Sequence, residues 1–145
     1  TNGVAQDDLQ RAAKLLQTNL RIGSIGTYPS VPVHGSTVLW EVEVLNDGPG
    51  LERFDLKMQA FTESGTLDDT VILHSGYWLD PSTNHWLQSG DYTVFSGYTY
   101  KFTIENTSKP EVNVSDNVKT VDINTLLLPD LRFNSVSRSP EYVEI

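Results

Sequence analysis

The chain has 145 residues, enough for one domain with a hydrophobic core. Hydrophobic residues make up 38% and charged residues 20%, a composition typical of a globular protein, and the absence of cysteine excludes disulfides, thiolate metal sites and a cysteine nucleophile. The formal net charge of -9 disfavours nucleic acid as a partner, and no apolar run approaches the roughly 18 residues of a membrane span, so we predict no membrane insertion.

The first predicted element is a short amphipathic helix within residues 1–18. Leu9, Ala12, Ala13 and Leu16 recur at i, i+3, i+4 and i+7 and form one apolar stripe. A helix this short is marginal by itself and must pack on something. Packing on its own domain and docking on another subunit both remain open. Residues 1–8 lack the basic and apolar regions of a signal peptide, so we expect that a signal was removed or never existed.

From residue 19 onward the hydrophobic period is two, which is typical of β-strands. Trp40, Val42 and Val44 point to one side of a strand, and Glu41 and Glu43 point to the other. The sequence Asn-Asp-Gly-Pro-Gly at residues 46–50 then predicts a turn. The same pattern predicts further strands, so the full set covers residues 39–45, 54–60, 70–78, 98–105 and 118–124.

Short alternating strands separated by turn residues predict an all-β fold. We expect an immunoglobulin-like antiparallel β-sandwich with a short N-terminal helix, in which one face of each sheet meets the core. Greek-key connections are expected from this class of fold. Trp40 is predicted to lie in the core, and Val121 and Ile123 are expected to face inward on the last strand.

The segment at the start of the sandwich recurs near the end of the chain. With a constant offset, Leu20-Arg21 corresponds to Leu131-Arg132, Ser24 to Ser135 and Pro29 to Pro140. The simplest interpretation is a tandem array, and chance similarity of two short β-segments is the alternative. We therefore divide the chain into a helical docking segment (1–18), an immunoglobulin-like sandwich (19–125), and a linker with the first strand of a second repeat or a strand for exchange (126–145).

Three short motifs resemble a known family. Leu128-Pro129-Asp130-Leu131 followed by Ser139-Pro140 is similar to the opening strand of the bacterial cell-adhesion-related domain, CARDB. Asn46-Asp47-Gly48 resembles the Asn-x-Gly after its second strand, and a stretch rich in Asn and Asp precedes residues 118–121, as before its last strand. The resemblance implies an immunoglobulin-like module, found in tandem on secreted proteins, without catalytic residues to transfer. Residues 67–97 are richer in aromatic side chains than this family leads us to expect.

No catalytic, metal or cofactor site is predicted. The chain has no Gly-x-Ser-x-Gly motif, and His34, His74 and His85 lack metal-ligand spacing. We interpret the three histidines as surface or turn residues. Carboxylates such as Asp68 and Asp69 are interpreted as solvated turn residues rather than calcium ligands.

The aromatic stretch is the best candidate for a binding site, because Trp and Tyr are rigid, amphipathic anchors. Hydrogen-bonding side chains lie beside them and suit a glycan or a protein. The alternative, which we favour, is that Trp78 and Trp86 close the end of the core. The candidate binding residues are Tyr77, Trp78, Asp80, Asn84, His85, Trp86 and Tyr92.

The first functional hypothesis is a non-catalytic structural or adhesive module of a tandem-repeat protein, extracellular or on a cell surface. Its partner would be a protein, either a second copy or a neighbouring subunit. The second is a virion decoration or head-fibre protein that docks on a capsid through its N-terminal segment. The third is a carbohydrate-binding module that uses Trp78 and Trp86.

Overall fold

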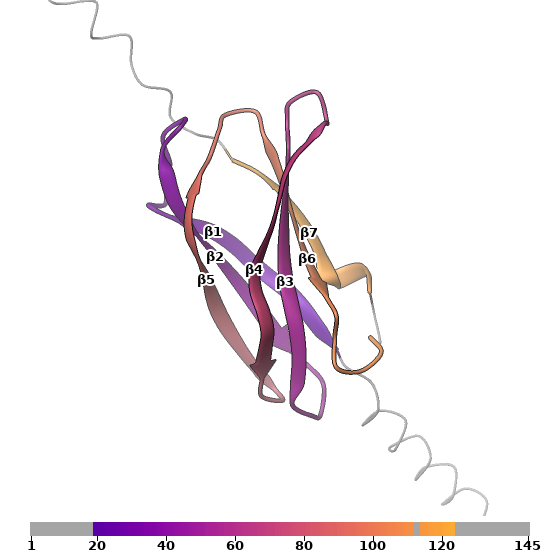
Figure 1. The fold of residues 1–145 in the computed structure, drawn as a ribbon. Helices are drawn as coiled ribbons and strands as arrows, with labels where there is room; N and C mark the ends of the chain where they lie inside the picture. Colours follow the sequence, from indigo (N-terminus) through magenta and orange to yellow (C-terminus); the bar gives the residue numbers. More distant parts are fainter. Residues whose placement is uncertain (1–18, 112–113, 124–145) are drawn as a thin grey trace, which may run out of the picture.

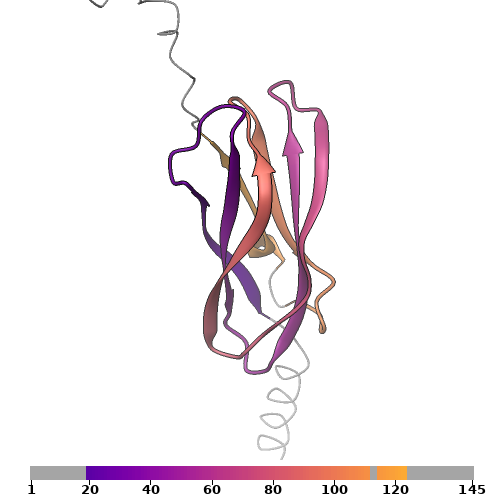
Figure 2. The ribbon, with the colours of Figure 1, turned by 60° about the vertical axis from the view of Figure 1, so that its left-hand side comes forward.

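The computed structural model describes residues 19–111 and 114–123, which form seven strands and one short 3-10 helix (Figures 1 and 2). The predicted N-terminal helix, the proposed second repeat and the strand for exchange lie outside these residues. In chain order the elements are β1 (Leu20–Tyr28), β2 (Thr37–Asn46), β3 (Glu52–Phe61), β4 (Leu67–Leu79), β5 (Thr83–Thr93), β6 (Thr99–Glu105), η1 (Ser115–Asn117) and β7 (Val118–Asp122).

The strands form two antiparallel sheets that face each other (Figure 1). One sheet has the order β1-β2-β5 and the other has the order β4-β3-β6-β7. The non-consecutive neighbours β2–β5 and β3–β6 require connections that cross between the sheets, as in the Greek-key sandwiches of the immunoglobulin class. The prediction of an all-β, immunoglobulin-like antiparallel sandwich is therefore confirmed.

The five strands predicted from the sequence correspond to β2, β3, β4, β6 and β7, and three of them show the predicted alternation clearly. In β2, β3 and β6, buried and partly exposed residues alternate along almost the whole strand. β5 is different, because the sequence analysis predicts no strand there. Only Leu87 among its residues is buried, so β5 has no clear apolar face of its own. Its extended conformation depends on backbone pairing with β2, from Thr37↔Thr93 to Asn46↔Thr83.

Trp40 lies in the centre of the core, as predicted. Its side chain is 1% exposed, and its ring lies 4.9 Å from the rings of both Tyr100 and Phe102. Val121 and Ile123 pack against this cluster, which confirms their inward orientation. The buried core residues are Leu20, Ile22, Val38, Trp40, Val42, Val44, Phe54, Leu56, Met58, Ala60, Leu79, Leu87, Val94, Tyr100, Phe102 and Ile104.

The Asn-x-Gly motif has a structural role at the turn after β2. The buried Asn46 side chain donates to the carbonyl oxygen of Gly50 at 2.8 Å and accepts from the Gly48 N–H at 2.9 Å. A Cβ atom at Gly48 would lie 3.2 Å from Asn46 Oδ1 and 3.3 Å from the backbone nitrogen of Asn19. Glycine is favoured at this position because the turn packs so closely against the start of β1.

The described chain begins and ends at opposite ends of the sandwich. β1 starts at the end where η1 lies, and β7 finishes at the far end (Figures 1 and 2). This follows from seven strands that alternate in direction, so that β1 and β7 run the same way. We call these the N-terminal and C-terminal ends of the sandwich.

Candidate binding surface

The aromatic stretch forms the connection between β4 and β5, which belong to different sheets. β4 ends at the buried Leu79 and β5 begins at Thr83. The turn between them is held by the Thr83 hydroxyl, which donates to the Asp80 carbonyl oxygen at 2.6 Å. Ser82 has a positive φ of 56° in this turn. Asp80 is exposed in this turn, where its backbone oxygen makes the stabilising contact.

Trp78 and Trp86 are surface residues rather than core residues, which corrects the interpretation that we favoured from the sequence. Their exposed fractions are 54% and 51%. Trp78 pairs with Arg53 in one sheet, and Trp86 pairs with Glu43 in the other. Directly paired residues share a face of the sheet, so each Trp lies on the outer face of its own sheet. The inner positions beside them belong to Leu79 and Leu87.

The two tryptophans consequently lie on opposite faces of the sandwich, and the structure does not bring them into one site. The physical reason is the pleat of the strand, because successive side chains point to opposite faces of a sheet. Tyr77 and His85 are paired with the buried residues Phe54 and Val44, so their side chains point inward, and they do meet. Their rings are stacked, with centroids 5.8 Å apart and an interplanar angle of 28°.

His74 joins this contact and closes the gap between the two sheets at their β4 and β5 edges. Its ring meets Tyr77 edge-on with centroids 5.8 Å apart, and its Nε2 donates to the Gln88 carbonyl oxygen at 2.8 Å. His74 and His85 therefore lie in strands rather than turns and have ring partners, and His85 is exposed, as predicted for a surface residue. His34 does lie in a turn, where its Nδ1 accepts from the Ser96 N–H at 2.9 Å.

Tyr92 is distant from the other candidate residues, near the opposite end of β5. Its hydroxyl donates to Asp69 Oδ2 at 3.0 Å and so makes a second tie between β5 and β4. Burial and this hydrogen bond raise the pKa of Tyr92. Asp68 accepts a similar bond from Tyr98 at 3.2 Å. The two aspartates are exposed, as predicted, but they lie in β4 rather than in a turn and have tyrosine partners.

Asn84 lies on the same outer face as Trp86. It is hydrogen-bonded to Glu43, which the sequence analysis did not single out as a site residue. The Asn84 amide donates to Glu43 Oε2 at 2.7 Å, and the Ser24 N–H donates to Oε1 at 3.2 Å. These two hydrogen bonds lower the pKa of Glu43. A shallow hollow of ≈ 340 Å³ adjoins them, lined by Leu45, Asp47, Ser82, Thr83 and Asn84.

A second group of residues that the sequence analysis missed lies at the N-terminal end. Glu52 is fully buried, accepts from the Ser108 hydroxyl at 2.8 Å, and has Lys109 Nζ 3.3 Å from its other carboxylate oxygen. Burial raises the pKa of the nearby Glu111 to about 7. The sequence contained one sign that Glu52 is buried. Glu52 lies two residues before Phe54, so the alternating pattern places both side chains on the inward face of β3.

Within residues 19–111 and 114–123, no three His, Asp or Glu side chains gather as a metal site would require. No helix in this part of the chain is long and apolar enough to cross a membrane. The candidate docking residues Leu9, Ala12, Ala13 and Leu16 lie outside the described residues, and their role stays a prediction.

Comparison with known proteins identifies the fold. No family model matches the sequence, and no curated protein matches it. The crystal structure of the CARDB domain of the PF1109 protein from Pyrococcus furiosus, in complex with di-metal ions, superimposes with a TM-score of 0.52 and 24% identity, covering 76% of this chain and 90% of that domain. The solution structure of the same domain gives 0.50 and 23%, with 76% and 96% covered. The chain has a CARDB-like fold.

The CARDB-like resemblance inferred from short motifs is thus confirmed at the level of the fold. A third structure, the alkylpurine DNA glycosylase AlkC from Pseudomonas fluorescens bound to DNA, has a TM-score of 0.53 at 8% identity. It covers 80% of this chain and only 33% of the glycosylase. Because such different proteins share this sandwich, the CARDB-like fold fixes the architecture, and function must be argued from surfaces.

Proposed function

We propose that this CARDB-like chain is a non-catalytic structural or adhesive module of a tandem-repeat surface protein. The observation that supports this most directly is the position of the two chain ends. Because β1 starts at one end of the sandwich and β7 finishes at the other, successive modules join end to end without folding back (Figure 1). The recurrence of Leu20-Arg21 as Leu131-Arg132 adds a second, independent argument for repetition.

The sandwich is also built to act as a stiff spacer. Strands such as β2 and β3 have 10 residues each, and at about 3.3 Å per residue they extend roughly 33 Å. The sheets are tied together at their β4 and β5 edges by the Tyr92–Asp69 and His74–Gln88 hydrogen bonds. Each repeat therefore adds a fixed length to an array.

Duplication of the chain tests the spacer role. Residues 1–130 followed directly by residues 20–145 recreate the repeat junction, because Leu131 corresponds to Leu20. We expect the maximum dimension from small-angle X-ray scattering to exceed that of the single chain by roughly 30–40 Å, one strand length plus a short link. A duplicate that grows by less than about 10 Å would have side-by-side modules and would refute the end-to-end arrangement.

A second candidate function is glycan binding by the outer face of the β1-β2-β5 sheet. Trp86 is half-exposed there, and Asn84, on the same face two residues away, borders the shallow hollow beside Asp47. An exposed indole ring next to carboxylate and amide groups is a suitable surface for a sugar. Trp78 has nearly the same exposure and lies on the opposite face, so it provides a matched control.

The two single variants separate this function from the sequence-based hypothesis that both tryptophans act together. We expect Trp86→Ala to reduce retention on immobilised glycans and Trp78→Ala to leave it unchanged. Equal retention by both variants and the parent chain would remove glycan binding through this face. Equal losses in both variants would instead indicate a non-specific effect of aromatic surface.

A further inference from the structure

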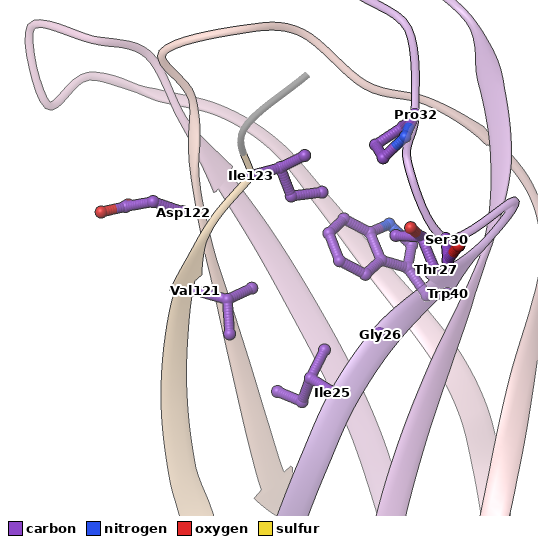
Figure 3. Close-up of a pocket in the computed structure, with 9 residues that line it drawn as sticks. All are labelled: Ile25, Gly26, Thr27, Ser30, Pro32, Trp40, Val121, Asp122 and Ile123. Carbon is purple, nitrogen blue, oxygen red and sulfur yellow. The ribbon is translucent and has the colours of Figure 1, made fainter. Parts of the chain in front are cut away.

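A cleft opens between β1 and β7 at the C-terminal end of the sandwich (Figure 3). It lies on the side opposite the β4 and β5 edges, which are tied together by side chains. Its volume is ≈ 270 Å³, and apolar and polar side chains both line it. The cleft is lined by Ile25, Gly26, Thr27, Ser30, Pro32, Trp40, Val121, Asp122 and Ile123.

The inner wall of this cleft is formed by Trp40, whose indole nitrogen lacks a hydrogen-bond partner in the described part of the chain. The Trp40 side chain is 1% exposed. A buried indole N–H normally finds an acceptor. Figure 3 shows the nitrogen on the side of the ring toward Ser30 and Pro32, with Ile25, Val121 and Ile123 around the rest of the cleft. The site thus combines the apolar side chains of Ile25, Val121 and Ile123 with one unused donor.

These features match a short apolar peptide segment better than a free ligand. Pockets for drug-sized molecules have volumes of roughly 300–1,000 Å³, and this cleft lies below that range. One or two aliphatic side chains can fill it, and a peptide carbonyl oxygen can accept from Trp40. The sequence after Ile123 contains such a segment, Leu126-Leu127-Leu128, within reach because each residue spans up to about 3.5 Å.

We propose that Leu126, Leu127 and Leu128 of the same chain occupy this cleft, and that one backbone carbonyl of the segment accepts a hydrogen bond from Trp40 Nε1. The position of Ile123 supports this assignment, since it is both a wall of the cleft and the residue from which the segment continues. Burial of the leucines removes apolar surface from water and covers the cleft between β1 and β7.

The inference extends the proposed function without resting on it. In a tandem array, residues 126–128 lie between one repeat and the next. A segment seated in the cleft would fix the direction in which the following module leaves the sandwich. Residues 126–128 can occupy the cleft whether or not the chain is repeated. A negative scattering result on the duplicated chain would therefore refute the end-to-end arrangement only, and a negative result in the experiment below would refute the occupied cleft only.

The test uses Trp40 as the only indole. The chain has three tryptophans, so Trp78→Phe with Trp86→Phe on the full chain leaves Trp40 alone. Indole N–H hydrogen exchange by NMR and acrylamide quenching of fluorescence then report on the cleft. In this background we expect Leu126→Ser with Leu127→Ser and Leu128→Ser to speed indole exchange about tenfold or more and to increase quenching, because the donor becomes accessible to water.

Two controls make the outcome specific. Leu131→Ser with Phe133→Ser and Val136→Ser removes as many apolar side chains further along the chain and should leave Trp40 unchanged. Addition of a peptide of residues 124–130 to the triple-serine protein should restore slow exchange.

Unchanged exchange in the triple-serine protein overturns the proposal. So does an equal increase in both serine variants, or an increase on Ser30→Ala alone, which would make Ser30 the acceptor. Cooperative urea unfolding of each variant separates a local opening from loss of the fold.

Discussion

The side-chain amide of Asn46 donates a hydrogen bond to the carbonyl oxygen of Leu79, 3.0 Å away, and so joins β2 to β4 across the two sheets. The same side chain holds the turn after β2 through Gly48 and Gly50. Asn46 has no exposed surface, so water does not replace these bonds when the side chain is removed. One residue therefore fixes both a turn and the relative position of two sheets.

Asn46→Ala should destabilise the sandwich by about 3 kcal/mol, because buried backbone groups lose their partners. Urea unfolding followed by circular dichroism measures the change. Asn84→Ala is the matched control, since Asn84 is exposed and bonds only a surface carboxylate, and its effect should stay within about 0.5 kcal/mol. Similar losses for the two variants would contradict a special role for Asn46.

Trp40→Ala should lower the free energy of unfolding by roughly 3–5 kcal/mol, because it leaves a cavity between Tyr100 and Phe102. Trp78→Ala, at a half-exposed position, should cost less than about 1 kcal/mol. Both values come from the same denaturation experiment. A loss below about 1 kcal/mol for Trp40→Ala would show that Trp40 is not a core residue.

The ion pair between the buried Glu52 and the partly exposed Lys109 predicts a double-mutant cycle with strong coupling. Lys109→Met should cost about 3 kcal/mol, because the Glu52 carboxylate is left buried without its cation. Glu52→Gln combined with Lys109→Met should recover much of that loss. Lys57→Met breaks the more exposed pair with Glu105 and should cost under about 1 kcal/mol. Additive effects in the Glu52–Lys109 cycle would disprove the coupling.

Glu111 predicts a dependence of stability on pH. Burial raises its pKa from the usual 4.5 to about 7, opposed by hydrogen bonds from Asn117 and the Leu20 N–H and supported by the charges of Asp116 and Glu52. Between these two pH values the folded chain binds more protons at this site than the unfolded chain does. Stability therefore falls as pH rises from 4.5 to about 7, and the loss is complete above pH 7.

Glu111→Gln should flatten this fall by on the order of 1–2 kcal/mol, less than the full shift implies because the group is partly solvated. The comparison is the difference in unfolding free energy between pH 4.5 and pH 7, measured by urea titration of both proteins. The exposed Glu63→Gln variant serves as a control and should parallel the parent chain. If Glu111→Gln also runs parallel to the parent, Glu111 does not titrate as inferred.

The sequence alone was sufficient where the structural signal is local. From Val38 to Val44 and from Phe54 to Ala60 every second side chain is apolar, so the period of two identifies the strand and its inward face, including the position of Trp40. The Asn-x-Gly turn is likewise readable, because the residues that stabilise it are neighbours in the chain. The all-β sandwich followed from these elements, and the CARDB-like fold followed from the resemblance of short motifs to that family.

The tertiary structure alone decided what depends on distant partners. β5 is a strand because it pairs with β2, and Trp78 and Trp86 face outward because their register sets them beside Arg53 and Glu43. The sequence of a run of aromatic residues does not show which residue of the neighbouring strand each one pairs with. A shift of the strand register by one residue would move every side chain to the opposite face of the sheet. The candidate binding stretch was therefore located from the sequence, whereas its division between two opposite faces was set by long-range strand pairing.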